Sequence, residues 1–251
     1  MTLARRSLIA LLAAAALADL AVALSPGLID RTLVELGLRP PPHLTLEQRL
    51  ALIGPGAVAR LKPYFDAAHV PYPPAGVTLV GLKAEKLLQL YARGGEPGSG
   101  WRLIRTYPVL AASGHLGPKL REGDKQVPEG IYGIDFLNPN SLYNVSMRVT
   151  YPNDDDRANA AKEGRSDLGG AIMIHGRAAS IGCLAMGDPA SEELFTLVAD
   201  VGMSNVTVIL APVDFRRAPR PVLTGEPNWV AGLYDRIEAA LKPLPLSDNA
   251  S

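Results

Sequence analysis

One cysteine and one histidine, eight residues apart, are the pair whose types and spacing point most directly to chemistry. Cys183 is the only cysteine of the chain, and His175 is one of four histidines. A free thiol has a pKa of about 8.5, which a neighbouring imidazolium lowers, and the resulting thiolate attacks carbonyl carbons. The histidine can then protonate a leaving amine. A lone cysteine is also often a buried structural residue, so both interpretations stand at this point.

Short elements must position this pair. The apolar run 171–174 predicts a buried strand that ends at His175. Ser180 and Gly182 predict a tight turn presenting Cys183, because glycine adopts conformations that side chains resist. The amides of Gly182 and Cys183 are the candidate oxyanion donors. A helix is predicted over 189–201, with Asp188 as its N-cap and Pro189 at its first position.

These residues also carry a family resemblance. The pattern His175-Gly176, Ser180, Gly182-Cys183, Met186 resembles the active-site signature of YkuD-type L,D-transpeptidases, which are cysteine acyltransferases acting on peptidoglycan stem peptides. Upstream, 113–124 and 128–132 are similar to the glycine turn and the P-x-G-x-Y strand of that family, and the resemblance covers about residues 76–215. The segments 138–141 and 151–153, with the short loop from histidine to cysteine, resemble the YafK-like branch.

The resemblance implies a fold and a set of roles. The fold is mainly β with helices (α+β), a curved sandwich of two sheets with a helical N-terminal segment and a C-terminal helix. Cys183 and His175 face each other in a cleft, as nucleophile and as base and later acid. The carbonyl of Gly176 orients the imidazole, and Ser180 holds the turn. Tyr132 lines the substrate cleft.

The family reaction leaves a choice of outcome. Its cysteine attacks the bond between diaminopimelate and D-alanine in a tetrapeptide stem, and the acyl group passes to an amine of another stem or of a lipoprotein lysine. Capture by water gives hydrolysis instead. Ala185 stands where many members carry an arginine, so the contact to the substrate carboxylate would fall to another cation, Arg177 or Lys119. Three hypotheses remain: a transpeptidase, a hydrolase of the same fold that cuts stem-peptide or lipoprotein links, and a non-catalytic peptidoglycan-binding module.

The first 24 residues predict export to the cell envelope or periplasm. Arg5-Arg6 precede an apolar run over 8–24, and 21–23 offer a small-x-small cleavage site. The segment is either cleaved or retained as an anchor, although Asp19 is unfavourable within a membrane span. Membrane contact is expected only through this segment if it is uncleaved. In an exported chain a single cysteine cannot form its own disulfide, which favours a reactive role.

The composition of the chain limits the kinds of partner that it is expected to bind. Lysine plus arginine and aspartate plus glutamate number 25 each, so bulk charge predicts no nucleic-acid partner. The mechanism requires no cofactor or metal. The acidic run 154–156 lacks the twelve-residue calcium-loop pattern and is interpreted as a solvated turn.

The remaining chain divides into a proline-rich helical segment over 25–75, a catalytic domain over 76–215, and a C-terminal helix and tail over 216–251. A capping box at Thr45 and Gln48 predicts a helix over 46–53, interrupted at 54–56 and followed by a second helix over 57–68 kinked near Pro63. Further helices are predicted over 158–163 and 229–241. Strands are predicted over 77–82, 87–92, 101–110, 131–136, 146–151 and 205–210.

Overall fold

The computed structural model describes residues 43–246. The predicted export segment, the first part of the proline-rich segment and the end of the tail lie outside these residues. Within residues 43–246, no helix is both long enough and apolar enough to span a membrane. Among the described residues, those from Leu44 onward form one compact unit.

The larger of two sheets has five strands and is mixed. Its order is β3 (Arg102–Pro108), β2 (Leu87–Arg93), β1 (Gly76–Leu82), β9 (Val206–Ala211), β4 (Gly130–Tyr132). Strand β1 pairs antiparallel with β2 and parallel with β9. All of its residues are buried, because side chains alternate between two covered faces. Val77 and Leu79 face the main core, whereas Val80 and Leu82 face a second core beneath a helix.

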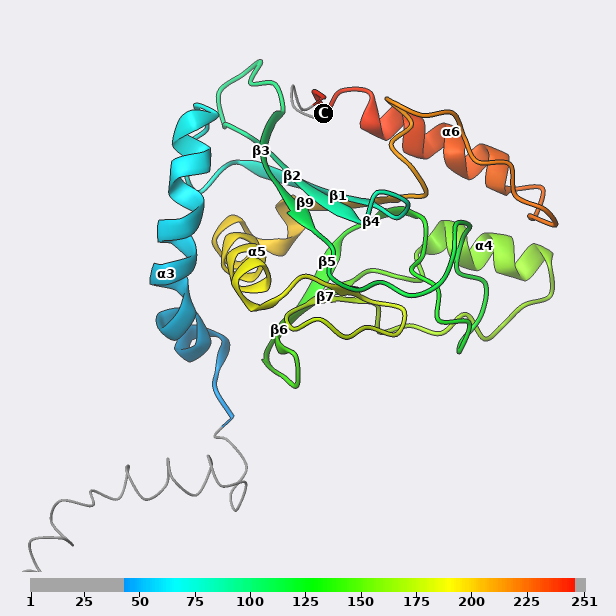
Figure 1. The fold of residues 1–251 in the computed structure, drawn as a ribbon, viewed down its shortest axis with the longest axis horizontal. Coiled ribbons are helices and arrows are strands. Elements are labelled where there is room, and N and C mark those ends of the chain that lie inside the picture. Colours follow the sequence, from blue (N-terminus) through cyan, green and yellow to red (C-terminus); the bar gives the residue numbers. More distant parts are fainter. Residues whose placement is uncertain (1–42, 247–251) are drawn as a thin grey trace, which may run out of the picture. The chain divides into compact units, whose positions relative to one another are not determined.

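Helices cover both faces of this sheet. Helix α6 (Val230–Leu241) packs on one face through Val230, Leu233 and Ile237. Helix α5 (Asp188–Val201) lies on the opposite face, as Figure 1 shows. Both helices begin within one residue of their predicted starts. The main core is enclosed by the larger sheet, helix α5 and the smaller sheet.

The smaller sheet carries the region of the cysteine. Its order is β5 (Ile134–Ser141), β6 (Asn144–Val149), β7 (Met173–His175), β8 (Leu184–Ala185). The single strand predicted over 131–136 is wrong, because the chain changes sheets there. Gly133 separates β4 from β5, and its N–H donates to Thr150 Oγ1 at 2.8 Å instead of continuing one ladder. The other predicted strands are present, with ends shifted by one or two residues.

The predicted break in the first helix is also wrong. Helix α3 (Leu46–Ala67) runs unbroken through Pro55 and Pro63, with the expected capping box at Thr45. Its buried stripe of Gly54, Ala57, Leu61 and Phe65 has helical spacing and packs toward α5. This tertiary packing compensates for the hydrogen bonds that the prolines cannot make.

Helix α3 is also tied to the domain by a buried carboxylate. Glu193 of α5 is 1% exposed and accepts hydrogen bonds from Arg60 Nε at 2.8 Å, Arg105 Nη1 at 2.6 Å and the Tyr107 hydroxyl at 2.9 Å. Arg60 belongs to α3, and the other two donors belong to β3. The helical segment is therefore part of the same compact unit as the strands.

The acidic run is a helix start rather than a turn. Helix α4 (Asp154–Lys162) begins after Asn153, whose side chain forms a capping box with Asp156. Asp154 and Asp155 are exposed, but Asp156 is partly buried. With two mixed sheets and four α-helices among the described residues, the fold is α+β, and it includes the expected N-terminal helical segment and C-terminal helix.

Candidate active site

Parallel pairing of β7 and β8 brings the histidine and the cysteine onto adjacent segments of the chain. His175 is the register partner of Ala185, and Ile174 is the partner of Leu184. Cys183 directly precedes β8, and its Sγ accepts the Met173 N–H of β7 at 3.4 Å, so the thiol lies beside the strand that ends in His175. The two side chains are thus offset by two residues along adjacent chain segments.

The imidazole of His175 is buried and held by the next residue. Its Nδ1 lies 2.6 Å from the carbonyl oxygen of Gly176, the contact expected from the sequence. A carbonyl only accepts, so Nδ1 carries the proton and Nε2 is the basic atom. A Cβ on Gly176 would lie 2.6 Å from both Asp188 Oδ1 and the Tyr143 carbonyl oxygen. Glycine is therefore required here by close approach of the surrounding atoms.

Tyr143, which sequence reasoning missed, packs against the imidazole of His175. Its ring centroid lies 4.6 Å from that of His175, at an interplanar angle of 43°. Its carbonyl oxygen accepts the Gly176 N–H at 3.0 Å. Tyr143 lies at the tip of the β5–β6 hairpin, and an exposed aromatic residue between two strands gave no signal of this contact in the sequence.

Ser180 builds the turn that carries the cysteine. Its Oγ accepts the Cys183 N–H at 2.9 Å and donates to the Cys183 carbonyl oxygen at 2.6 Å. Gly182 has φ of +85°, a conformation that favours glycine. The hydroxyl thus joins both backbone polar groups of Cys183 and fixes where the thiol projects.

The thiol makes its own contacts with the backbone. Cys183 Sγ accepts from the Met173 N–H at 3.4 Å and lies 3.8 Å from the carbonyl oxygen of Ala171. No hydrogen bond joins it to His175 in the part of the chain that the structure describes. Burial raises the pKa of the Cys183 thiol, against the opposing effects of the Met173 amide and of Lys119. Burial also lowers the pKa of His175.

The directions of these two pKa shifts differ from the sequence-based prediction, which was a thiolate beside an imidazolium. A raised thiol pKa and a lowered imidazole pKa both favour the neutral forms. The free protein therefore favours a thiol and a neutral imidazole, and a thiolate forms only when the thiol proton is transferred.

The two amides predicted as oxyanion donors both have partners. The Cys183 N–H donates to Ser180, and the Gly182 N–H donates to Ser113 Oγ at 2.6 Å. Ser113 in turn donates to the Lys125 carbonyl oxygen at 2.7 Å. Sequence reasoning placed Ser113 only in the family's glycine turn, and its separation from Gly182 by 69 residues hid the contact.

The three predicted substrate contacts have different surroundings. Tyr132 is buried at 5% exposure, and its hydroxyl donates to the Glu129 carbonyl oxygen at 3.1 Å. Lys119 is also buried, with its Nζ 2.6 Å from Asp124 Oδ1, so its charge is already paired. Arg177 is the exposed residue of the three, and among the described residues its side chain has no polar partner.

The backbone of Arg177 explains a further difference at the next helix. Its N–H donates to Asp188 Oδ1 at 2.8 Å. Asp188 was predicted as the N-cap of α5, but that position is occupied by Gly187, whose φ is +77°. Asp188 instead orders the loop that follows His175.

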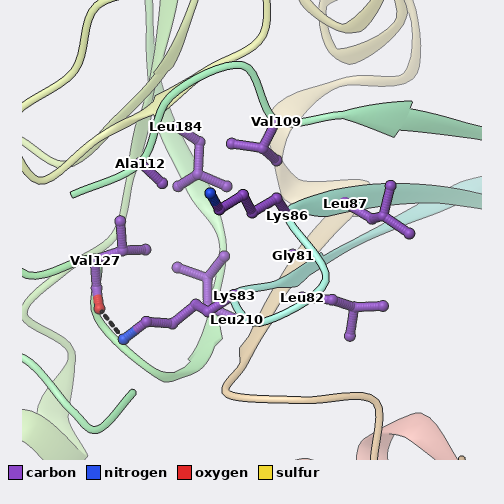
Figure 2. A pocket seen from close by; sticks show the side chains of 10 residues that line it. All are labelled: Gly81, Leu82, Lys83, Lys86, Leu87, Val109, Ala112, Val127, Leu184 and Leu210. Atoms are coloured by element: carbon purple, nitrogen blue, oxygen red, sulfur yellow. Dashed lines mark hydrogen bonds between the residues drawn. The ribbon is translucent and has the colours of Figure 1, made fainter. Parts of the chain in front are cut away.

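A small apolar cavity lies behind the strand that follows the cysteine. Its volume is about 20 Å³, room for about one water at most, and its walls include Leu184, Val109 and Gly81. Figure 2 shows Lys86 extending toward Leu184, and Lys83 reaching the Val127 carbonyl oxygen. Lys83 Nζ also lies 2.9 Å from Glu129 Oε1, and burial lowers its pKa. The size of the cavity makes it a packing feature rather than a substrate pocket.

The described residues contain no cluster of three or more histidine, cysteine, aspartate or glutamate side chains arranged to bind a metal ion. The polar groups of the site are a thiol, an imidazole, two serine hydroxyls and backbone amides. This donor set is typical of acyl-transfer enzymes rather than of metal centres.

Comparison with known proteins also indicates an acyl-transfer enzyme. The L,D-transpeptidase catalytic domain (YkuD) matches residues 76–213, more than half of the chain. The chain therefore belongs to the L,D-transpeptidase catalytic domain family, whose activity relates to peptidoglycan.

The relatives are similar over part of their length. YafK of Escherichia coli (strain K12) is 36% identical over 135 residues, which are 52% of this chain and 51% of that protein, and YafK of strain O157:H7 gives the same values. The chain thus spans about half the length of the curated relatives that it matches.

Among solved structures, the helical cell shape determining protein Pgp2 from Campylobacter jejuni matches with a TM-score of 0.43 and 24% identity, over 55% of this chain and 48% of that one. The Mycobacterium tuberculosis L,D-transpeptidase 1 matches with a TM-score of 0.31 and 14% identity, over 54% of this chain and 62% of that one.

Proposed function

We propose that the chain is a cysteine acyltransferase, an L,D-transpeptidase that acts on peptidoglycan stem peptides through a thioester on Cys183. The observation that supports this proposal is the pairing of β7, which ends in His175, with β8, which begins directly after Cys183, together with the contact of Sγ with the Met173 N–H. The bond from Nδ1 to Gly176 leaves Nε2 of the imidazole to exchange a proton with the thiol. Membership of the family supplies the substrate class.

The reaction begins from the neutral pair. His175 Nε2 takes the thiol proton as Sγ bonds to the acyl carbon, and the carbonyl electrons move to its oxygen. The adduct collapses to a thioester as the C–N bond breaks, and His175 returns the proton to the amine of the departing D-alanine. An acceptor amine then attacks the thioester carbon and gives up a proton to His175. The C–S bond breaks, and His175 passes that proton to the released sulfur, which restores the free thiol.

Arg177 is the proposed contact for the substrate carboxylate. Ala185 is completely buried and is bonded on both sides, to β7 and to the backbone of Ala111. It offers only a methyl group where many family members have a guanidinium. Arg177 lies on the loop directly after His175 and Gly176, and its side chain is exposed. A guanidinium there binds a carboxylate in bidentate fashion.

The acceptor determines the outcome. The proposed acceptors are the side-chain amine of a second stem or a lysine of a lipoprotein in the cell envelope, to which the first 24 residues would direct the chain by export. A hydrolase is the alternative, because the loss of the family arginine at Ala185 removes one fixed contact for the usual tetrapeptide end.

The test is incubation of the purified protein with disaccharide-tetrapeptide, followed by mass spectrometry of products and of intact protein. Cys183→Ala serves as the inactive variant and Ser204→Ala as a matched exposed control. Loss of D-alanine with a cross-linked dimer, abolished only in Cys183→Ala, is expected. Tripeptide without dimer would replace transferase by hydrolase. Absence of both products and of any acyl adduct on Cys183 would overturn the catalytic proposal.

A further inference from the structure

The tetrahedral adduct of the proposed reaction needs hydrogen-bond donors for its oxyanion. Such donors must lie 2.7–3.1 Å from the developing charge. The amides of Gly182 and Cys183 are already bonded to hydroxyl groups, at 2.6 Å and 2.9 Å. Another group near Cys183 must therefore donate a hydrogen bond to that oxygen.

Ser180 is unsuited to this task. Its hydroxyl proton is committed to the Cys183 carbonyl oxygen at 2.6 Å, while its oxygen accepts the Cys183 N–H. Redirecting that proton would break the bond that shapes the turn.

Ser113 has the right position. Residues 110 and 111 run beside β8, where Leu110 N–H donates to the Ala185 carbonyl oxygen at 2.8 Å and Ala111 forms an antiparallel bridge with Ala185. Two residues further along, Ser113 Oγ accepts the Gly182 N–H at 2.6 Å, which places the hydroxyl beside the residue that precedes Cys183.

Its hydrogen bonds leave the hydroxyl proton of Ser113 free to rotate to a new acceptor. Ser113 Oγ accepts the Gly182 N–H and donates to the carbonyl oxygen of Lys125, an exposed loop residue. A hydroxyl proton rotates about its C–O bond without moving the oxygen. The Gly182 N–H bond polarises the hydroxyl and makes it a stronger donor. The segment around Ser113 is fixed on its other side, because His115 N–H donates to Gln126 Oε1 at 2.8 Å.

We propose that the Ser113 hydroxyl is the side-chain oxyanion donor of this site, with the Gly182 amide acting through it rather than directly on the substrate. When Sγ bonds to the acyl carbon, the Ser113 proton turns from Lys125 to the oxygen that gains the electron pair. No proton is transferred in this step, and the hydroxyl returns to Lys125 when the adduct collapses. This inference rests on the proposed thioester chemistry at Cys183.

The test compares acylation with alkylation of Cys183. Acylation by disaccharide-tetrapeptide passes through an oxyanion, whereas alkylation by iodoacetamide displaces iodide at a saturated carbon and forms none. Both rates are measured on the intact protein by mass spectrometry, under single-turnover conditions. Variants are Ser113→Ala, Ser113→Thr, which keeps the hydroxyl, and the exposed Ser204→Ala.

Ser113→Ala is expected to slow acylation by about 10²–10³-fold, the range found for loss of one oxyanion donor, and to change alkylation less than about threefold. Ser113→Thr should recover most of the acylation rate. An unchanged acylation rate in Ser113→Ala, or an equal fall in both rates, would overturn the role of Ser113 while leaving Cys183 chemistry intact. Failure of the unsubstituted protein to acylate while still alkylating would instead count against the proposed function.

Discussion

The two sheets of this domain differ in how they are supported. The larger sheet has strands of six or seven residues at its centre, and the central β1 is buried along its whole length. In the smaller sheet, β7 has three residues and β8 has two. The larger sheet is held by apolar burial on both faces, whereas the cysteine depends on a few hydrogen bonds from serine hydroxyls and backbone groups.

Because of this difference, the larger sheet contributes mainly to the stability of the fold, and the region of the cysteine contributes mainly to the reaction. Burial of apolar side chains is non-directional and tolerates small shifts, but it cannot aim a thiol or an imidazole. Hydrogen bonds around Ser180 and Gly176 are directional and aim both groups. Substitutions in the larger sheet should therefore act mainly on the free energy of unfolding, and those around the cysteine mainly on rate.

The largest expected effect comes from matched deletions in the two sheets. Leu79→Ala removes a fully buried side chain of β1 and should lower the free energy of unfolding by about 3–5 kcal/mol. Leu184→Ala, next to Cys183 and beside the existing cavity, should cost about 2–3 kcal/mol and also slow acylation. Urea unfolding measures the free energy of unfolding of each variant, and single-turnover experiments measure its rate of acylation. Equal activity loss per folded molecule in the two variants would contradict the proposed separation.

Ser180→Ala removes two hydrogen bonds of the cysteine turn at once. Because the thiol then loses its fixed direction, acylation and alkylation should both fall, acylation by about 10²-fold. The free energy of unfolding should fall by only about 1–2 kcal/mol. Ser204→Ala is the control, and parallel urea titrations report stability. A stability loss without a rate loss would show that the turn does not aim the thiol.

Asp156, which lies next to Tyr132 at the end of the larger sheet, provides a test through the pH dependence of unfolding. Burial raises the pKa of Asp156 to about 6 from its ordinary 3.8. Since the folded protein binds this proton more tightly than the unfolded chain, the free energy of unfolding falls as pH rises from about 4 to 6 and stays lower above. Asp156→Asn should therefore stabilise the protein at pH 7.5 by about 1–3 kcal/mol.

The matched control for this prediction is Asp154→Asn, the same change on an exposed residue of the same helical turn. It should leave the pH dependence of unfolding in place. Urea titrations at pH 5 and pH 7.5 compare the variants. If Asp156→Asn kept the full pH dependence, the carboxylate responsible would lie elsewhere.

Tyr143→Leu should give the smallest effect, confined to rate. Loss of the ring beside His175 removes a contact of the kind that contributes about 0.5–1.5 kcal/mol, which corresponds to acylation that is about twofold to thirteenfold slower. Tyr143→Phe keeps the ring and should retain the rate. Stopped-time mass spectrometry of the acyl-enzyme measures both variants. A deficit in Tyr143→Phe as large as that in Tyr143→Leu would point to the hydroxyl instead.

Local sequence determined much of this molecule. Alternation and helical spacing gave the strands and helices of the domain to within one or two residues in most cases. Ser180 and Gly182 indicated a tight turn at Cys183, and Gly176 was the expected partner of the imidazole, because these contacts join residues close in sequence. The capping box of α3 was likewise a local pattern.

Only the tertiary structure decided features that depend on distant partners. Helix α3 continues through Pro55 and Pro63 because its stripe packs against α5, and the chain changes sheets at Gly133 because Thr150 receives its N–H. The neutral states favoured for Cys183 and His175 come from burial, which spacing cannot report. Ser113 reaches Gly182 across 69 residues of sequence, and no local pattern encodes that distance.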